Sequence, residues 1–405
     1  MQSGANSEAR HSNIIRAKTK DDRSLKGDFL ITGSMDIPFL AITIALLTIG
    51  LIMLFSASYP YAYARQNYNS YYFINRQLIF AAAGIVVMFI MSKINYKWLK
   101  VGALILVPIT FILLAIVLII PATVVSDTGE AFKRWIQIGP IQFQPSDVAK
   151  FTLILVFAIY INKFYSKMKT LLYGIAFPLI ILGVFCIFIV LEHHLSCTIL
   201  MFLLGAAMMY VGGTNRYLYA FGLAVLIIAV VLVVLNPEII PSQYARERII
   251  SWTDKKFSPD DMRWQTNNSL YAIGSGGFTG VGLGNSKQKY LYVSEPQNDF
   301  IFSIVCEELG FLGAAAIIIL FGLLVYRGIK IAQKATDRFG ALLVIGVVSQ
   351  IGIQVILNIL VVTDTIPNTG IALPFFSYGG TAMLMLLFEV GVVLSVSRKA
   401  SQKRV

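Results

Sequence analysis

The chain has 405 residues, of which 57% are hydrophobic and only 13% are charged, and its formal net charge is +12. Soluble globular domains carry about 25% charged residues, so this composition excludes a soluble protein and indicates a membrane protein. The positive charge is not evidence for a nucleic-acid partner, because most Lys and Arg residues lie between apolar runs, where they report membrane topology.

Ten apolar runs have the length and composition of membrane-spanning helices, although the fourth is short. In chain order they are 37–57, 73–92, 101–120, 148–161, 171–191, 194–211, 217–235, 300–325, 339–362 and 373–396. The runs are continuously apolar rather than alternating, which favours helices over a β-barrel. The sequence therefore predicts an all-α polytopic membrane protein with ten transmembrane helices. The first 34 residues are polar, and no N-terminal signal peptide is expected.

The basic residues predict the topology. One side of the membrane receives 21 of the 33 Lys and Arg residues, in the N-terminal tail, 93–100, 163–169, Arg216, 327–338 and the C-terminal tail. By the positive-inside rule, this side is cytoplasmic. We expect a cytoplasmic tail over 1–36, a membrane domain over 37–397 and a second cytoplasmic tail over 398–405. A large extracytoplasmic loop, 236–299, then lies between the seventh and eighth helices.

Two of the predicted extracytoplasmic segments are longer than the other connections. The segment 121–147 contains Arg134 and ends in Gln-Pro-Ser-Asp. The loop 236–299 has seven basic and seven acidic residues, so it has no net charge, and its aromatic residues argue against disorder. Any anion bound by this loop must therefore be bound by particular side chains rather than by a general positive field.

Two segments are rich in glycine. The segment 274–284 lacks the Gly-Lys-Ser/Thr of a P-loop and the preceding strand of a dinucleotide-binding motif, so it does not predict nucleotide binding. We expect it to form a re-entrant or membrane-surface turn that lines the site, with a purely structural turn as the alternative. In the segment 373–381, Pro374 and paired glycines indicate a kinked or broken entry into the last helix.

Neither the cysteines nor the histidine pair predicts a metal site or a disulfide. Cys186, Cys197 and Cys306 lie within predicted helices and have no paired spacing, as expected of small buried apolar residues. The adjacent His193 and His194 supply only two ligands, which do not make a structural zinc site.

Four segments, taken in order, resemble the SEDS family of cell-wall polymerases, whose members include FtsW, RodA and SpoVE. They are 134–136 with 144–146, 272–277, 295–302 with 307–310, and 369–380. The resemblance covers essentially the whole chain, and 296–298 and 369–371 are most similar to the division and sporulation branch. It implies a peptidoglycan glycosyltransferase of the bacterial inner membrane that polymerises lipid II onto an undecaprenyl-linked glycan. The implied partners are a class B penicillin-binding protein and other divisome or elongation proteins.

In this reaction a sugar 4-hydroxyl attacks the anomeric carbon of the donor, and lipid pyrophosphate leaves. The family motif assigns the catalytic base to Asp299, at the end of the large loop; from the residues alone, a helix N-cap is the alternative. A positioned base contributes about 10²- to 10⁴-fold to a rate. A Mg²⁺ or Mn²⁺ ion on the pyrophosphate fits the chemistry, but no carboxylate cluster requires one, and no other cofactor is expected.

Polar residues of the predicted outer segments are candidates for binding the substrate, and for each of them an ordinary solvated surface residue is the alternative. The candidates for binding pyrophosphate are Arg134, Arg248, Lys287 and Lys289, and the candidates for binding sugar or peptide groups are Gln265 and Gln288. The family motifs add Glu295, Ser377 and Tyr378.

Ionisable residues inside the predicted helices indicate structural roles. Glu307 and Glu308 lie roughly 12 Å deeper than Asp299, and we expect them to hold helices together, with substrate contact as the alternative. In the family, the lysine at the position of Lys150 pairs with an aspartate that is His194 in this chain. We expect Glu192 to supply the charge instead, or His194 to act as a neutral hydrogen-bond partner.

A lipid II flippase and a non-catalytic division scaffold are the alternative functions. Charges inside the helices, at Lys150, Glu307, Glu308 and Glu389, fit a transporter. However, the distinctive residues gather at the outer face rather than at the midplane, and no internal repeat is evident. A scaffold predicts that changing Asp299 leaves function intact. We therefore predict a polymerase.

Overall fold

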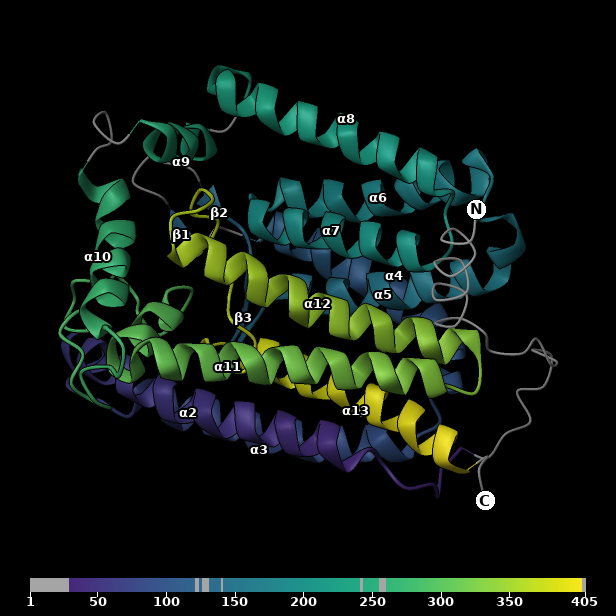
Figure 1. Cartoon of the computed structure of the whole chain (residues 1–405), viewed down its shortest axis with the longest axis horizontal. Helices are drawn as coiled ribbons and strands as arrows, with labels where there is room; N and C mark the ends of the chain where they lie inside the picture. The colour runs from purple at the N-terminus through teal and green to yellow at the C-terminus, as the bar shows by residue number, and fades with distance from the viewer. Residues whose placement is uncertain are drawn as a thin grey trace, which may run out of the picture.

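The computed structural model describes residues 29–120, 124–125, 131–139, 141–240, 243–254 and 260–402. Its elements, shown in Figure 1, are α2 (Ile37–Arg65), α3 (Tyr72–Lys93), η1 (Tyr96–Trp98), α4 (Leu99–Ile119), β1 (Val124–Val125), β2 (Ala131–Phe132), β3 (Ile136–Ile138), β4 (Ile141–Phe143), α5 (Pro145–Phe164), η2 (Tyr165–Lys167), η3 (Leu172–Ala176), α6 (Phe177–Leu191), α7 (Leu195–Val211), α8 (Arg216–Leu235), η4 (Pro237–Ile239), α9 (Gln243–Thr253), α10 (Asp260–Gly276), α11 (Ile301–Lys334), α12 (Arg338–Val362) and α13 (Gly380–Gln402). The strands form two short antiparallel pairs, β1 with β2 and β3 with β4.

Within the described residues, nine helical segments are long and apolar enough to cross a membrane, and α7 is a shorter apolar helix of 17 residues. The prediction of an all-α polytopic protein with ten membrane helices is confirmed. Local sequence signals explain where several of these helices begin. The side chains of Asp36, Asn215 and Asp337 each accept a hydrogen bond from a backbone amide in the first turn of α2, α8 and α12, and Pro145 begins α5.

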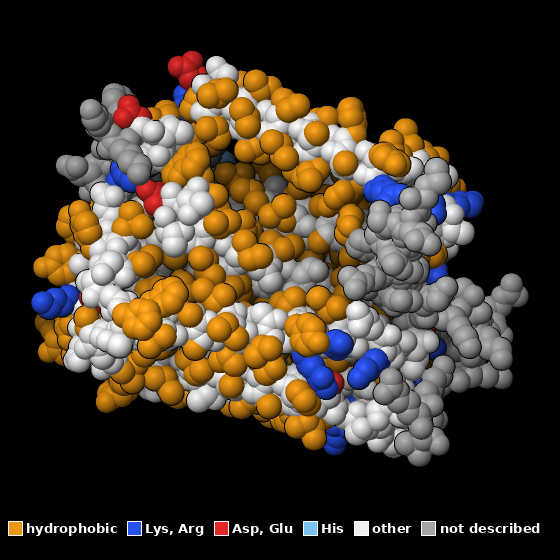
Figure 2. All heavy atoms as spheres, in the orientation of Figure 1, with side chains coloured by type: hydrophobic (Ala, Val, Ile, Leu, Met, Phe, Trp, Pro, Cys, Tyr) orange, Lys and Arg blue, Asp and Glu red, His pale blue; other side chains and the backbone are white. Residues whose placement is uncertain are grey.

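The bundle is built around α12 and α13. Both helices are buried over most of their length, and α13 packs along α3 while α12 contacts α5, α7 and α11. In contrast, none of the residues of α8 whose side chains are described is buried, and the helix lies along one edge of the bundle. Figure 2 shows that the surface is hollowed between α8 and the helices beside it, with hydrophobic side chains around the hollow.

The bundle has two different ends. Ser34 Oγ lies 2.6 Å from Ser401 Oγ, and Arg398 donates a 2.9 Å hydrogen bond to the carbonyl of Gly33, so the two ends of the described chain meet at what we call the terminal end. At the opposite end, the loop end, lie β1–β4, α9, α10 and the segment that leads to α11 (Figure 1). This arrangement agrees with an even number of crossings.

Several predicted boundaries are wrong in detail. The fourth helix, predicted over 148–161, is the 20-residue α5, because its first turn contains polar residues that are buried in the bundle. The last helix, predicted from 373, begins at Gly380, after a non-helical stretch that includes Pro374. It continues to Gln402, past its predicted end at 396. The large loop contains α9 and α10, and most of the predicted tail 1–36 lies outside the described residues.

Candidate active site at the loop end

The glycine-rich segment fills a break in α11. Gly310 has φ 66° and ψ −169°, so α11 is interrupted nine residues after its first residue, Ile301. The carbonyls of Glu307 and Glu308, left without helical partners, accept 3.0 Å hydrogen bonds from the amides of Val281 and Gly282. Two amides beyond the break donate to the glycine-rich segment in return. These contacts favour the structural turn over a turn that lines the substrate site.

The carboxylates of Glu307 and Glu308 fix the segment that follows the glycines. Glu307 accepts hydrogen bonds from Ser286 Oγ (2.5 Å) and from the amide of Lys287 (2.9 Å). Glu308 accepts from Ser56 Oγ of α2 (2.7 Å) and pairs with Lys289 Nζ at 2.9 Å. Both carboxylates are therefore occupied within the protein rather than by substrate.

Two of the predicted substrate residues in this segment point inward. Lys289 is only 1% exposed, and its ammonium group is held by Glu308 and by the carbonyl of Gly284. This position corrects the prediction that Lys289 binds pyrophosphate, because its charge is already paired inside the protein. Gln288 is partly buried, and its backbone amide donates a 3.4 Å hydrogen bond to the Glu307 carboxylate. Lys287, in contrast, is exposed.

Asp299 lies immediately before α11, at the loop end of the bundle. Its backbone carbonyl accepts a 2.7 Å hydrogen bond from Asn358 Nδ2 of α12, and the same nitrogen donates to the carbonyl of Ile371. Asn358 thus ties the aspartate to the segment between α12 and α13. That segment passes close to the carboxylate: a Cβ on Gly370, which has φ 69°, would lie 2.9 Å from Asp299 Oδ2 and 4.0 Å from Ser196 Oγ.

Two arginines act on the Asp299 carboxylate. Burial raises the pKa of Asp299 to about 6, and the positive charge of Arg248 opposes this rise most strongly. The negative charge of Glu295 adds to the rise, and the positive charge of Arg134 opposes it. Arg248 donates a 2.6 Å hydrogen bond from Nη1 to the carbonyl of Asn368, and Arg134 donates to the carbonyl of His193. The loop end therefore brings together one partly buried carboxylate and two guanidinium groups from separate segments.

Gln265 extends this site along α10. It donates a 2.8 Å hydrogen bond to the carbonyl of Ser294 and accepts one from Asn368, the residue whose carbonyl holds Arg248. Glu295 is exposed and accepts hydrogen bonds from Tyr61 of α2 (3.4 Å) and Asn298 (2.8 Å).

Ser377 and Tyr378 hold the backbone of the segment that leads to Asp299. Ser377 Oγ donates a 2.8 Å hydrogen bond to the carbonyl of Asn298, and the amide of Tyr378 donates one of the same length to the carbonyl of Gln297. Burial raises the pKa of the Tyr378 phenol. Their observed contacts are with the backbone of the segment that ends at Asp299.

Lys150 has a different partner from the one predicted. Its ammonium group lies 2.8 Å from Asp147, one turn earlier on α5. Neither Glu192 nor His194 pairs with it, which corrects that prediction: in a helix, a residue three positions earlier shares the same face and needs no second element. The imidazole of His194 instead faces Gln144 (3.4 Å), and burial holds the pKa of His194 well below its usual range, with Arg134 and Lys150 adding to the effect.

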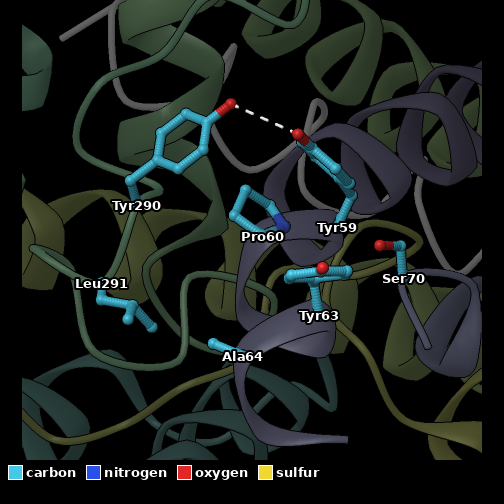
Figure 3. A pocket seen from close by; sticks show the side chains of 7 residues that line it. All are labelled: Tyr59, Pro60, Tyr63, Ala64, Ser70, Tyr290 and Leu291. Carbon is cyan, nitrogen blue, oxygen red and sulfur yellow. Dashed lines mark hydrogen bonds between the residues drawn. The ribbon is translucent and has the colours of Figure 1, made fainter. Parts of the chain in front are cut away.

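The remaining features of the described chain supply no second reactive centre. Cys186, Cys197 and Cys306 are free, and no group of three or more His, Cys, Asp or Glu side chains within the described residues is arranged to hold a metal ion. A cavity of about 410 Å³ lies between α2 and the segment after the glycines, as Figure 3 shows, with Tyr59 and Tyr290 facing each other across 3.5 Å. None of the predicted site residues lines this cavity.

Sequence reasoning missed several residues that shape the site. Asn358 and Ser56 are polar residues within apolar helices, a signal that should have marked them. Gly370 was part of a family motif, but its closeness to Asp299 depends on how two distant segments meet. No feature of the sequence predicts that Asn368 lies beside both Arg248 and Gln265.

Comparisons with known proteins agree over nearly the whole chain. The family model of FtsW, RodA and SpoVE, described as "Cell cycle protein", matches residues 38–402. "Stage V sporulation protein E" of Bacillus subtilis (strain 168) is 38% identical over 366 residues, which cover 90% of this chain and 97% of that protein. "Probable peptidoglycan glycosyltransferase FtsW" of Geobacter sulfurreducens is 34% identical, with 90% of this chain and 95% of that protein covered.

Two solved structures share the fold. One, described as "Structural coordination of polymerization and crosslinking by a peptidoglycan synthase complex", superposes with a TM-score of 0.74 at 24% identity and covers 91% of this chain and 99% of that one. RodA of Thermus thermophilus superposes with a TM-score of 0.62 at 22% identity, covering 90% and 97%. At these identities the likeness extends to the fold alone.

Proposed function

This chain belongs to the FtsW, RodA and SpoVE family of cell cycle proteins and is a peptidoglycan glycosyltransferase, and we propose that Asp299 is the general base of its reaction. The base takes the proton of the acceptor 4-hydroxyl as its oxygen attacks the anomeric carbon of the lipid-linked donor. The bond to lipid pyrophosphate breaks in the same step, and the glycan grows by one disaccharide.

The observation that carries this assignment is the setting of Asp299. Its carboxylate lies at the loop end, directly before a membrane helix, so a lipid can present its headgroup there while its tail stays in the bilayer. Burial raises the pKa of Asp299 to about 6, which keeps the carboxylate ionised at neutral pH but makes it a stronger base than an exposed aspartate.

Arg134 and Arg248 are proposed to bind the pyrophosphate. Both act on Asp299 electrostatically, and both hydrogen-bond to backbone carbonyls, which fixes their guanidinium groups at the site. Guanidinium groups can donate two parallel hydrogen bonds to phosphate oxygens. Gln265 and Glu295 lie close to each other beside this site and are proposed to contact the sugars or the peptide. Lys287 and Gln288 remain candidates that lie further from Asp299. A Mg²⁺ or Mn²⁺ ion is a prediction from the chemistry alone, since the described residues offer no carboxylate cluster for one.

The hollow beside α8 is the proposed path for the lipid tail. It is surrounded by hydrophobic side chains, and α8 is the least buried membrane helix of the described chain. We further propose that the loop end faces the outside of the bacterial inner membrane and that both termini are cytoplasmic, in accord with the basic residues near the terminal end. A class B penicillin-binding protein and other divisome proteins are the proposed partners, in division or sporulation.

Polymerisation of labelled lipid II by the purified protein, with its transpeptidase partner present, tests the assignment. Asp299→Asn keeps the size of the side chain and removes the base, and Glu238→Gln changes an exposed carboxylate near the same end as the control. We expect glycan ladders from the wild type and the control and none from Asp299→Asn. Equal ladders from all three would remove Asp299 from the reaction. No polymer from the wild type, where a known polymerase works, would favour transport or scaffolding.

A further inference from the structure

Glu192 is a carboxyl group that the reaction described above does not use. It follows the last residue of α6, in the turn to α7, and is completely buried. Neither of its carboxyl oxygens has a hydrogen-bond partner among the described residues. More than about 90% of buried polar groups in proteins are hydrogen-bonded, and leaving one unsatisfied costs about 1–3 kcal/mol. A partner from outside the chain would explain why this group is kept.

The turn that carries Glu192 borders the Asp299 site. Arg134, one of the two proposed pyrophosphate ligands, donates its hydrogen bond to the carbonyl of His193, the next residue in the turn. In the first turn of α7, Ser196 Oγ lies 4.0 Å from the position that a Cβ on Gly370 would take, and this position is 2.9 Å from Asp299 Oδ2. Arg134 also acts electrostatically on the Glu192 carboxyl group, so Glu192 lies on the Arg134 side of the site, where we place the leaving group.

Its surroundings keep Glu192 protonated. Burial raises the pKa of Glu192 to about 8, and Arg134 only partly opposes the rise. The other ionisable groups of this region are His193 and His194 in the same turn, Cys197 on α7 and the pair of Lys150 with Asp147 on α5. A negative carboxylate at this place would repel a pyrophosphate, whereas a neutral carboxylic acid can donate a hydrogen bond to it.

We propose that Glu192 is the general acid of the transfer reaction, and that together with Arg134 it binds the leaving lipid pyrophosphate. This inference rests on the proposed function. The bond between the anomeric carbon and the pyrophosphate oxygen breaks with its electron pair going to that oxygen, and Glu192 gives the pyrophosphate its proton. The new glycosidic bond forms as Asp299 takes the proton of the 4-hydroxyl. Exchange with solvent then reprotonates Glu192 and deprotonates Asp299.

In other enzymes, two carboxyl groups act as acid and base because their environments give them different pKa values. Asp299 and Glu192 differ in the same way. Asp299 loses its proton near pH 6 because two arginines partly offset its burial, and Glu192 keeps its proton to about pH 8 because only Arg134 does so. The pKa values predict a rate that rises through about pH 6, is highest between the two values and falls above about pH 8. A purely structural Glu192 predicts no such fall.

The test is the pH dependence of lipid II polymerisation by the wild type, Glu192→Gln and Glu192→Asp. Gln can still donate a hydrogen bond but has no proton to give, so we expect kcat to fall about 10²- to 10⁴-fold with little change in KM. The loss of rate above about pH 8 should also disappear. Asp retains the acid on a shorter side chain and should restore part of kcat together with the alkaline fall.

Thermal unfolding of each variant separates this result from misfolding, and Asp299→Asn separates it from failure of the proposed function. If the wild type polymerises, Asp299→Asn is inactive and Glu192→Gln keeps the wild-type rate and alkaline fall, then the general-acid role is wrong while the proposed function stands. If Glu192→Gln and Glu192→Asp are equally inactive and both melt earlier than the wild type, Glu192 is a structural residue and the inference is also wrong.

Discussion

Gly310→Ala tests the contact between α11 and the glycine-rich segment. The φ of 66° and ψ of −169° at Gly310 belong to a region that is essentially restricted to glycine, and forcing another residue there costs about 1–3 kcal/mol. The new Cβ would also lie 2.2 Å from the backbone nitrogen of Gly280, which cannot rotate away as a side chain can. The segment must move, at the expense of the hydrogen bonds from Val281 and Gly282.

Each of these two backbone hydrogen bonds contributes about 0.5–1.5 kcal/mol, so the whole change is expected to cost about 2–6 kcal/mol. Thermal unfolding in detergent, followed by tryptophan fluorescence, measures it. Gly322→Ala is the matched control, because it lies on the same helix and its Cβ meets no atom within 4 Å. We expect Gly310→Ala to melt well below the wild type and Gly322→Ala to melt close to it. Equal melting of the two variants would refute the description of the break in α11.

Three further changes act on the site and its support. Glu295→Gln removes a charge that raises the pKa of Asp299, so the rise of polymerisation rate with pH, expected near pH 6 in the wild type, should move to lower pH. Lys289→Ala leaves the buried carboxylate of Glu308 without its partner and should lower the free energy of unfolding by about 3–5 kcal/mol, measured as thermal unfolding. Gly370→Ala places a methyl group 2.9 Å from Asp299 Oδ2 and should lower kcat about tenfold or more, measured as initial rate of ladder formation.

Each of these changes has a control nearby. Lys287→Ala removes a neighbouring but exposed lysine and should leave unfolding nearly unchanged. Gly274→Ala adds a methyl group where no atom lies within 4 Å and should leave kcat unchanged. If the rise of rate with pH occurs at the same pH in Glu295→Gln as in the wild type, the reasoning on Glu295 is wrong. If Lys289→Ala is as stable as Lys287→Ala, the reasoning on Lys289 is wrong. If Gly370→Ala is as fast as Gly274→Ala, the reasoning on Gly370 is wrong.

The membrane architecture could be predicted because a bilayer imposes a length and a composition on every helix that crosses it. The helix boundaries were less accurate where polar residues are buried or apolar residues are not helical. Asp147 lies in the buried first turn of α5, and Leu373 and Phe375 are buried in the non-helical stretch before α13. Hydrophobicity alone does not separate these cases, since it records burial and not backbone conformation.

The candidate site could be predicted only in part. Asp299 and the two arginines could be chosen from motifs and from charges in loops, but their meeting at one place depends on the packing of α10, α12 and the segment near Gly370. Lys289 shows the limit most clearly. A lysine in a polar loop is normally solvated, and only the fold of the glycine-rich segment brings this one beneath the surface to Glu308.

The most direct test of the central claim is to measure, in one reaction, glycan ladders and released undecaprenyl pyrophosphate from labelled lipid II, for the wild type and for Asp299→Asn. The account predicts that the wild type forms both products in step, and that Asp299→Asn, folded as judged by its thermal unfolding, forms neither. Formation of both products by Asp299→Asn at the wild-type rate would contradict it.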